Sequence, residues 1–394
     1  MLHVLHQRLR FRIGCEAKRR KIVGLAAFDG QDELLKHLPG FIRLDGRLRA
    51  RLGRGILGKY RCRAKYRETN AYLEKRSRHF VLQIYLHRSL TATRPAATLL
   101  PMRVLSPAKI NLHLRIGPPG SDGFHPLMSW FVTVGLFDTM GISPLNRPGI
   151  SLLLCDRSDV PIDRTNLIVR AGEAMLESIG DGRLGALIEL IKAIPIGGGL
   201  GGGSSNGASA IRGLNQFWRL NWPLEKLATI GAKIGSDVPF FFFGPSSVCT
   251  GRGEFVQPIA APMPKFAVLI FPSFGVSTAQ VYRKFDEMKL GKVSDVEIQP
   301  PWSDWTKLSA RQLLPLLVND LEPPAFAICP ELGKMRSDLE SRLGRIVRMS
   351  GSGSTLFTLA DDWADAADLV SRLQPTGLDA RALEISPEIA DDLH

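Results

Sequence analysis

A run of glycines followed by two serines has the clearest chemical meaning in this sequence. Residues 195–205 read P-I-G-G-G-L-G-G-G-S-S. Glycine adopts backbone angles that other residues avoid, and it has no side chain to keep a ligand away from the main chain. Residues 204–218 then place apolar side chains at helical spacing, so the run opens a helix whose N-terminus carries partial positive charge. The pattern predicts a loop whose backbone N–H groups bind phosphate.

This glycine run differs from the two commonest phosphate-binding loops. A Walker A loop requires a lysine directly after its last glycine, and no lysine follows this run. Three of its glycines have the spacing of a Rossmann fingerprint, but Glu225 lies at what looks like a helix start and not at the end of a second strand. A flexible linker is the other alternative, although linkers are polar throughout and this run contains Ile196 and Leu200. Phosphate binding is the interpretation that the residues favour.

Composition places the chain among soluble globular proteins. Its 394 residues are enough for two or three domains, and 44% are hydrophobic and 23% charged. No apolar run approaches the ~20 residues that span a bilayer. The five cysteines are scattered and odd in number, which argues against a disulfide framework and a zinc site. We therefore expect a cytoplasmic protein with no membrane partner.

The positive charge is concentrated at the front of the chain. Residues 1–101 contain 23 Lys and Arg against 7 Asp and Glu, which leaves 28 basic and 31 acidic residues for the remainder. We expect translation to begin at Met102, so that residues 1–101 belong to an upstream extension; a disordered tail and an organelle transit peptide are alternatives. The charge alone would also suit a nucleic-acid-binding arm, but no recognition module is present, and we expect no nucleic-acid partner.

Strands and helices alternate from Met102 onward. The pattern predicts strands at residues 102–116 (interrupted by a proline), 128–134, 150–154, 185–192, 266–271, 346–349, 356–359 and 380–385. It predicts helices at residues 164–179, 204–218, 224–234, 278–288, 310–317, 331–339 and 363–373. A proline-rich stretch at 258–264 indicates a boundary between domains 102–260 and 261–394. The expected fold class is α+β, with two lobes.

Five segments in fixed order resemble the GHMP kinase superfamily, and within it the family of 4-diphosphocytidyl-2-C-methyl-D-erythritol kinases. They are S-P-A-K-I-N-L (106–112), D-G-F-H-P-L (122–127), P-I-G-G-G-L-G-G-G-S-S-N (195–206), I-G-S-D-V-P-F-F (234–241) and M-S-G-S-G-S-T-L-F (349–357), supported by N-D-L-E (319–322). The resemblance covers residues 102 to about 385. It implies a ribosomal-protein-like N-terminal ATP-binding lobe and a ferredoxin-like C-terminal lobe.

The resemblance implies a reaction and two catalytic residues. The reaction is ATP-dependent phosphorylation, assisted by Mg²⁺, of the 2-hydroxyl of 4-diphosphocytidyl-2-C-methyl-D-erythritol in non-mevalonate isoprenoid biosynthesis. Asp237, expected in a turn before an apolar strand, would accept the hydroxyl proton. Lys109 would keep Asp237 ionised and stabilise negative charge on the moving phosphoryl group.

The resemblance also assigns the residues that would bind ATP. The glycine loop and the start of its helix would bind the triphosphate through Pro195, Gly197, Gly198, Gly199, Leu200, Gly201, Gly202, Gly203, Ser204 and Ser205. A third glycine turn, formed by Gly351, Ser352 and Gly353, would lie close to the phosphates; a plain hairpin turn is the alternative. The serine hydroxyls could reach Mg²⁺, but the metal ligands stay open.

For the acceptor substrate, the resemblance indicates an aromatic–histidine pair that holds the cytosine. Here the pair is Phe124 and His125, where tyrosine is more usual at the first position, so stacking is kept and a phenol hydroxyl is lost. Tyr282 would cover the other face of the base, or it is simply a buried helix aromatic. Asn111 would contact the methylerythritol or its phosphate. The expected assembly is a monomer or weak homodimer.

Two alternatives to this reaction stay open at the level of sequence. The first is a different GHMP kinase, for homoserine or mevalonate, which would have no use for a base-binding pair. The second is a non-catalytic relative that binds ligand only; the presence of both Lys109 and Asp237 argues against it.

Overall fold

The computed structural model describes residues 12–14, 25–27, 41–44, 47–50 and 101–393. The chain forms two compact units, residues 1–83 and 84–394. In the first unit, the described residues form an antiparallel sheet in the order β1-β2-β4-β3, whose strands are β1 (Arg12–Gly14), β2 (Leu25–Ala27), β3 (Phe41–Leu44) and β4 (Arg47–Ala50). The expectations about a tail or a start at Met102 concern residues that lie mostly outside the described ranges.

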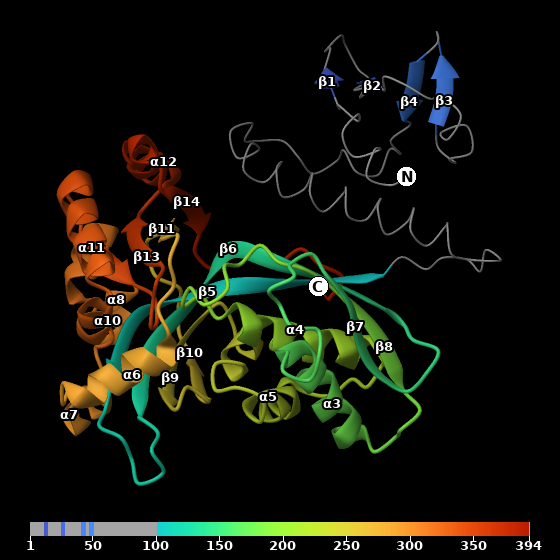
Figure 1. Cartoon of the computed structure of the whole chain (residues 1–394), viewed down its shortest axis with the longest axis horizontal. Helices are drawn as coiled ribbons and strands as arrows, with labels where there is room; N and C mark the ends of the chain where they lie inside the picture. Colours follow the sequence, from blue (N-terminus) through green and yellow to red (C-terminus); the bar gives the residue numbers. More distant parts are fainter. Residues whose placement is uncertain (1–11, 15–24, 28–40, 45–46, 51–100, 394) are drawn as a thin grey trace. The chain divides into compact units, whose positions relative to one another are not determined.

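Two long strands form the spine of the second unit (Figure 1). β5 (Met102–Ile116) pairs antiparallel with β6 (Leu127–Pro144) along its whole length. The opposite edge of β6 pairs first with β9 (Ser246–Gly251) and then with β8 (Gly185–Ile191). The register of β5 shifts after Pro107, because proline has no N–H for the ladder. The predicted strand with an interruption at this proline is therefore confirmed.

Helices cover one face of this six-stranded sheet, which β7 (Gly149–Cys155) and β10 (Phe255–Pro258) complete at its two ends. α4 (Gly202–Phe217) packs on β5 and β6, and α3 (Leu167–Ile179) packs on β7 and α4. α5 (Leu224–Ala232) lies against both helices (Figure 1). The helical spacing seen in the sequence thus directs apolar side chains onto the sheet, where they form one continuous core.

A second sheet forms the C-terminal lobe in the antiparallel order β12-β13-β11-β14. Its strands are β11 (Phe266–Phe271), β12 (Arg348–Met349), β13 (Leu356–Ala360) and β14 (Asp379–Glu384). The helices of this lobe are α6 (Thr278–Glu287), α7 (Val293–Glu297), α8 (Trp302–Trp305), α9 (Ala310–Leu313), η2 (Leu314–Leu316), α10 (Glu322–Ile328), α11 (Pro330–Leu343), α12 (Trp363–Leu373) and η3 (Gln374–Thr376).

The two lobes meet along the middle of β6. The N–H of Ser386 donates to the Thr133 carbonyl at 2.9 Å, and Ile385 forms an isolated bridge with Val134. These contacts fall in the gap between the β9-paired and β8-paired halves of β6. Apolar residues of β5 and β6 share a core with those of β11 and β13. Both lobes are therefore built onto the same pair of strands, and the α+β class with two lobes expected from the sequence is confirmed.

The predicted elements are found, with one change of type and some differences in extent. The strand predicted at 128–134 continues to Pro144 in β6, and β9 and β10 were not predicted. The apolar residues after Asp237 form a 3₁₀ helix, η1 (Pro239–Phe242), and not the predicted strand. A proline at its first position fixes a helical φ, and the phenylalanines then point into the core on several sides of one short turn. Within the part of the chain that the structure describes, no helix is long and apolar enough to cross a membrane.

Stability should depend on pH through His113 on β5. Burial lowers the pKa of this imidazole to about 3, and its Nδ1 accepts the N–H of Val318. The unfolded chain binds a proton below pH 6.5 that the folded chain cannot take up, so stability is lost as the pH falls. Between pH 6.5 and 5 this residue should remove ~2 kcal/mol of unfolding free energy. Urea unfolding at both pH values should show that loss in the wild type and not in His113→Gln; equal losses in the two proteins would contradict it.

Candidate active site

Lys109 and Asp237 come from distant parts of the sequence and form an ion pair. The Lys109 Nζ lies 3.3 Å from an Asp237 carboxylate oxygen. The lysine side chain is only 5% exposed, whereas the aspartate side chain is 31% exposed. A buried ammonium thus supports a carboxylate that solvent or a ligand can reach. This is the arrangement that a proton acceptor beside developing negative charge requires.

The turn that carries Asp237 is anchored at both ends. It follows α5 and leads directly into η1; Val238, just before η1, and Phe240 within it are fully buried. On its open side lies the turn between β9 and β10, where a Cβ on Gly253 would stand 3.4 Å from an Asp237 carboxylate oxygen. Burial, and to a smaller extent the charge of Asp237, raises the pKa of the neighbouring Cys249 thiol. This cysteine therefore stays protonated and is no nucleophile.

Lys109 is held by contacts on several sides. Its Nζ donates to Asn111 Oδ1 at 2.7 Å and lies 4.4 Å from the centre of the Phe131 ring. Its backbone N–H donates to the Leu200 carbonyl at 2.9 Å, which ties β5 to the glycine loop. The side chain of Lys109 runs directly beneath this loop: a Cβ on Gly201 would stand 2.9 Å from the Lys109 Cε. The ammonium is thus fixed next to the predicted phosphate site.

Asn111 uses both ends of its amide within the protein. Besides accepting from Lys109, it donates from Nδ2 to Ser129 Oγ at 2.9 Å. The geometry makes Asn111 a positioning residue for the lysine. Its predicted contact with the methylerythritol end of a substrate stays a prediction.

The glycine loop takes the backbone conformation that its sequence predicts. Gly197, Gly199 and Gly201 have φ values of 70°, 75° and 66°, in the left-handed region that other residues rarely adopt. A Cβ on Gly199 would stand 2.1 Å from the carbonyl oxygen of Ser350, so no side chain fits there. Ser350 Oγ also donates to the Gly199 carbonyl at 2.9 Å. The loop is therefore closely packed against the third glycine turn.

The third glycine turn is more than a plain hairpin connection. Its Ser352 hydroxyl lies 2.7 Å from Thr278 Oγ1 at the start of α6. A Cβ on Gly351 would stand 3.2 Å from Asn111 Oδ1, so this turn, the glycine loop and β5 meet at one place. The structure thus brings together the predicted phosphate-binding and catalytic residues.

The N-terminus of α4 can accept an anionic ligand. No side chain caps it, and Gly203 in its first turn is exposed. Ser205 Oγ is fully buried and has no hydrogen-bond partner in the structure. A buried hydroxyl without a partner is costly, and unpaired N–H groups at a helix start attract phosphate. These observations fit a triphosphate at this position; Pro195 and Ser204, both partly exposed, lie on either side of the loop.

His125 and Tyr282, predicted to hold a base, lie together. Their ring centres are 5.4 Å apart. Burial, and to a smaller extent the charge of Asp237, raises the pKa of Tyr282 to about 12. The Nδ1 of His125 donates to the Gly117 carbonyl at 2.9 Å, and its Nε2 lies 3.2 Å from Asp286. A base that binds Nε2 would have to displace this half-exposed carboxylate.

Phe124, the other aromatic residue predicted to hold the base, is exposed. It retains 54% of its accessible surface. One of its faces is covered by the guanidinium of Arg252, whose central carbon lies 3.9 Å from the ring centre. An aromatic ring that keeps this much exposed surface is suited to stacking.

Comparisons with known proteins agree with this geometry. The description of the GHMP kinases N terminal domain matches residues 166–245, and that of the GHMP kinases C terminal domain matches residues 305–377. The 4-diphosphocytidyl-2-C-methyl-D-erythritol kinase of Prochlorococcus marinus is 40% identical over 285 residues, covering 69% of this chain and 88% of that protein. The kinase of the same name from Pseudarthrobacter chlorophenolicus is 32% identical over 295 residues, covering 72% of this chain and 92% of that protein.

The chain belongs to the 4-diphosphocytidyl-2-C-methyl-D-erythritol kinase family of GHMP kinases.

Two solved kinase structures have a fold similar to that of this chain. A crystal structure of 4-(cytidine 5'-diphospho)-2C-methyl-D-erythritol kinase is similar with a TM-score of 0.59 at 33% identity, covering 73% of this chain and all of that one. A homoserine kinase from Cytophaga hutchinsonii has a TM-score of 0.55 at 16% identity, covering 75% of this chain and 97% of that one. The second likeness shows the fold alone.

A buried polar network beneath the glycine loop of this kinase was not predicted from the sequence. Lys192 forms an ion pair with Asp138 and donates to Asn206 Oδ1 at 3.2 Å. The other carboxylate oxygen of Asp138 accepts the N–H groups of Ala193 and Ile194 at 2.8 and 2.9 Å. The network links β6, the segment before the loop and α4, and it places the Lys192 Nζ 3.2 Å from where a Cβ on Gly202 would stand. The lysine just before the glycine run was the available signal.

Removing one partner of this network should destabilise the kinase strongly. Asp138 is fully buried, so Asp138→Ala removes the counter-charge of the Lys192 ammonium and leaves two backbone N–H groups without a partner. Loss of one member of a buried ion pair costs about 3–5 kcal/mol. Denaturant unfolding should show this loss for Asp138→Ala and a smaller loss for the double variant Asp138→Ala/Lys192→Met, which removes both charges. A loss below 1 kcal/mol in the single variant would contradict the structural role.

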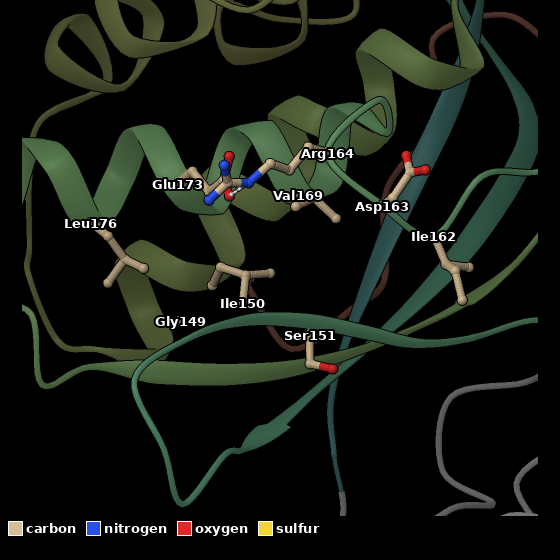
Figure 2. A pocket seen from close by; sticks show the side chains of 9 residues that line it. All are labelled: Gly149, Ile150, Ser151, Ile162, Asp163, Arg164, Val169, Glu173 and Leu176. Atoms are coloured by element: carbon tan, nitrogen blue, oxygen red, sulfur yellow. Dashed lines mark ion pairs between the residues drawn. The ribbon is translucent and has the colours of Figure 1, made fainter.

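A broad, open pocket lies elsewhere on the N-terminal lobe (Figure 2). Its volume is about 930 Å³, and it lies between β7 and the start of α3. The Arg164–Glu173 ion pair, 2.8 Å long, lies along one side, and Ser151 lies on the strand opposite. None of the residues predicted to bind ATP or substrate lines this pocket, so size alone does not locate the site of chemistry.

Proposed function

We propose that the protein transfers the γ-phosphoryl group of ATP to the 2-hydroxyl of 4-diphosphocytidyl-2-C-methyl-D-erythritol, a step of non-mevalonate isoprenoid biosynthesis. The observation that carries the proposal is the buried Lys109, placed between the Asp237 carboxylate and the underside of the glycine loop. Curated relatives at 32–40% identity have this activity in their names, and this chain has the residues in an arrangement that can perform it.

The acceptor hydroxyl needs a group that takes its proton as it attacks phosphorus. Asp237 is the candidate, because its carboxylate is accessible and fixed at the end of a rigid turn. Lys109 lies 3.3 Å away and carries the positive charge that stabilises both the ionised aspartate and the negative charge on the transferred group. Phosphoryl transfer passes through a loose transition state, which an enzyme stabilises mostly by positioning the reactants and neutralising negative charge. Asp237 and Lys109 would contribute to both.

ATP would bind with its phosphates at the glycine loop and the N-terminus of α4. The backbone N–H groups of Gly197 to Gly203 would bind the β- and γ-phosphates, and the partnerless Ser205 hydroxyl would gain a hydrogen bond. Mg²⁺, when bound, would neutralise phosphate charge; the hydroxyls of Ser204 and Ser205 are the candidate protein contacts. Among the described residues, no group of three or more His, Cys, Asp or Glu side chains forms a metal site, so the phosphates would supply most metal ligands.

The cytidine end would bind between α6 and the loop after β5. His125 and Tyr282 supply a hydrogen-bonding edge and a face, and Phe124 supplies a second aromatic surface. A substrate without a base, such as homoserine or mevalonate, would leave these surfaces unused. The base-binding residues thus support the cytidylyl substrate over those of other GHMP kinases.

We further infer a cytoplasmic protein with small-molecule partners. The scattered cysteines and the metabolite substrate support this location. We expect a monomer or weak homodimer with no nucleic-acid partner.

A comparison of three alcohols tests the substrate assignment. The full chain, with ATP and Mg²⁺, should phosphorylate 4-diphosphocytidyl-2-C-methyl-D-erythritol with a kcat/KM at least about 10³-fold higher than for homoserine or mevalonate, because only that substrate can use the base contacts. The readout is ADP release measured with each alcohol in turn. Preference for homoserine or mevalonate would keep the kinase and overturn the assignment of Phe124, His125 and Tyr282.

A further inference from the structure

The turn between β9 and β10 reaches two functional regions at once. Its Gly251 and Gly253 have φ values of 73° and 115°, which lets the chain reverse within four residues. A Cβ on Gly253 would stand 3.4 Å from an Asp237 carboxylate oxygen, so this glycine lies against Asp237. The next residue toward the N-terminus, Arg252, extends in the other direction, onto the loop that carries Phe124.

Arg252 makes two contacts with that loop. Its guanidinium lies over the ring of Phe124, with 3.9 Å between the central carbon and the ring centre. It also pairs with the Asp122 carboxylate. The other Asp122 oxygen accepts the N–H of Phe124 at 3.0 Å. The hydrogen bond from Phe124, followed by Arg252, lowers the pKa of Asp122 below its usual range, which agrees with a carboxylate that stays ionised in this pairing.

These contacts leave the aromatic ring with one covered and one open face. Phe124 keeps over half of its accessible surface although the guanidinium occupies one face. A phenylalanine has no hydroxyl with which to hold its own orientation, so an exposed ring would rotate freely without a contact of this kind. A planar cation over one face restricts the ring and leaves the opposite face for a second planar group.

We propose that Arg252 and Asp122 form a brace that fixes Phe124 for stacking, so that the cytosine ring of the substrate binds on the face opposite the guanidinium. Arg252 is thus a positioning residue that determines affinity for the cytidylyl substrate. The inference rests on the proposed function and deepens it, since it explains how an exposed phenylalanine can serve as a base platform.

The chemistry of arginine suits this task better than that of lysine. The guanidinium is planar and can lie flat on a ring while an N–H in its plane donates to a carboxylate, as Arg252 does to Asp122. A lysine ammonium carries the same charge but is a compact, strongly hydrated group that cannot do both. A lysine variant therefore separates the brace from simple attraction between a positive charge and the substrate diphosphate.

The first test compares single variants in steady-state kinetics. Arg252→Ala should raise the KM for 4-diphosphocytidyl-2-C-methyl-D-erythritol about tenfold, with the KM for ATP and kcat within about twofold of wild type. Arg252→Lys should show most of this rise. Arg311→Ala, which removes an exposed arginine of α9, is the charge-matched control and should leave all three constants unchanged. Wild-type constants in Arg252→Lys would overturn the brace in favour of charge attraction alone.

The second test asks whether Arg252 acts through the ring. In a Phe124→Leu background the brace has nothing to hold, so adding Arg252→Ala should change the substrate KM by less than about twofold. An equal tenfold rise in both backgrounds would overturn the proposal. Both side chains are exposed, so the variants should fold; thermal melting at the wild-type temperature would confirm it.

Failure of this inference and failure of the proposed function give different results. Without turnover by the wild type, the proposed function fails. The brace is then tested by calorimetric titration with cytidine 5'-diphosphate, which wild type should bind about tenfold more tightly than Arg252→Ala while both bind ADP equally. Wild-type turnover with unchanged constants in Arg252→Ala would overturn the brace alone.

Discussion

Asp237→Asn should lower kcat by about 10²–10⁴-fold while ATP binds as before. Asparagine keeps the size and most hydrogen bonds of the side chain but cannot take the proton of the acceptor hydroxyl, a contribution of that order in general base catalysis. The variant should fold, because the aspartate side chain is partly exposed and the turn is anchored by the buried residues of η1. Rapid-quench single-turnover assays with saturating ATP would measure the rate of the chemical step directly.

The matched control for this prediction is Asp338→Asn, an exposed aspartate of α11 in the C-terminal lobe. It removes the same charge far from the glycine loop in sequence and should leave kcat within about twofold of wild type. A kcat for Asp237→Asn within tenfold of wild type would show that the aspartate takes no proton, and Lys109 would then act through positioning and charge alone. Loss of ATP binding in Asp237→Asn would also contradict the separation of roles.

Gly199→Ala should reduce kcat/KM for ATP by about 100-fold or more. The glycine has φ 75°, and a Cβ would stand 2.1 Å from the Ser350 carbonyl oxygen, so either the glycine loop or the third glycine turn must move. A displacement of about 1 Å in a group that positions phosphate costs on the order of 10² in rate. Isothermal titration with ADP, beside steady-state kinetics, would show whether affinity falls with the rate.

Gly344→Ala separates this close contact from backbone strain. Gly344 ends α11 with φ 59°, also in the left-handed region, but no atom lies within 4 Å of its added Cβ. This variant should lose up to ~2 kcal/mol of stability and keep wild-type kinetics. Equal kinetics in Gly199→Ala and wild type would contradict the glycine loop as the phosphate site.

Local patterns in the sequence predicted most of the fold and the groups that do chemistry. Alternating apolar residues located β5, short apolar runs located β11 and β13, and helical spacing after the glycine run located α4. The glycine run predicted left-handed conformations that the structure shows. Such features depend on residues within one turn or one strand of each other, which a single sequence displays directly. The type of η1 was missed because four apolar residues in a row suit a strand as well as a short helix.

Contacts between distant residues could not be read from the sequence. Lys192 and Asp138 are separated by 54 positions, and Arg252 and Asp122 by 130. Nothing in the sequence near Lys192 or Arg252 identifies its partner, since many carboxylates of the chain could pair with either one. The same holds for the hydrogen bond between Lys109 and Asn111 Oδ1, which the sequence did not predict. The pairings arise because the fold brings the β5–β6 loop beside the β9–β10 turn, and β6 beside the segment after β8.

Phosphorus NMR of the reaction mixture tests the central claim most directly. The full chain, ATP and 4-diphosphocytidyl-2-C-methyl-D-erythritol should yield ADP and one new phosphomonoester resonance, while the diphosphate resonances of the cytidylyl group remain. That result would show transfer of the γ-phosphoryl group to a substrate alcohol. ATP hydrolysis to inorganic phosphate without a new ester, or loss of the substrate diphosphate, would contradict the account.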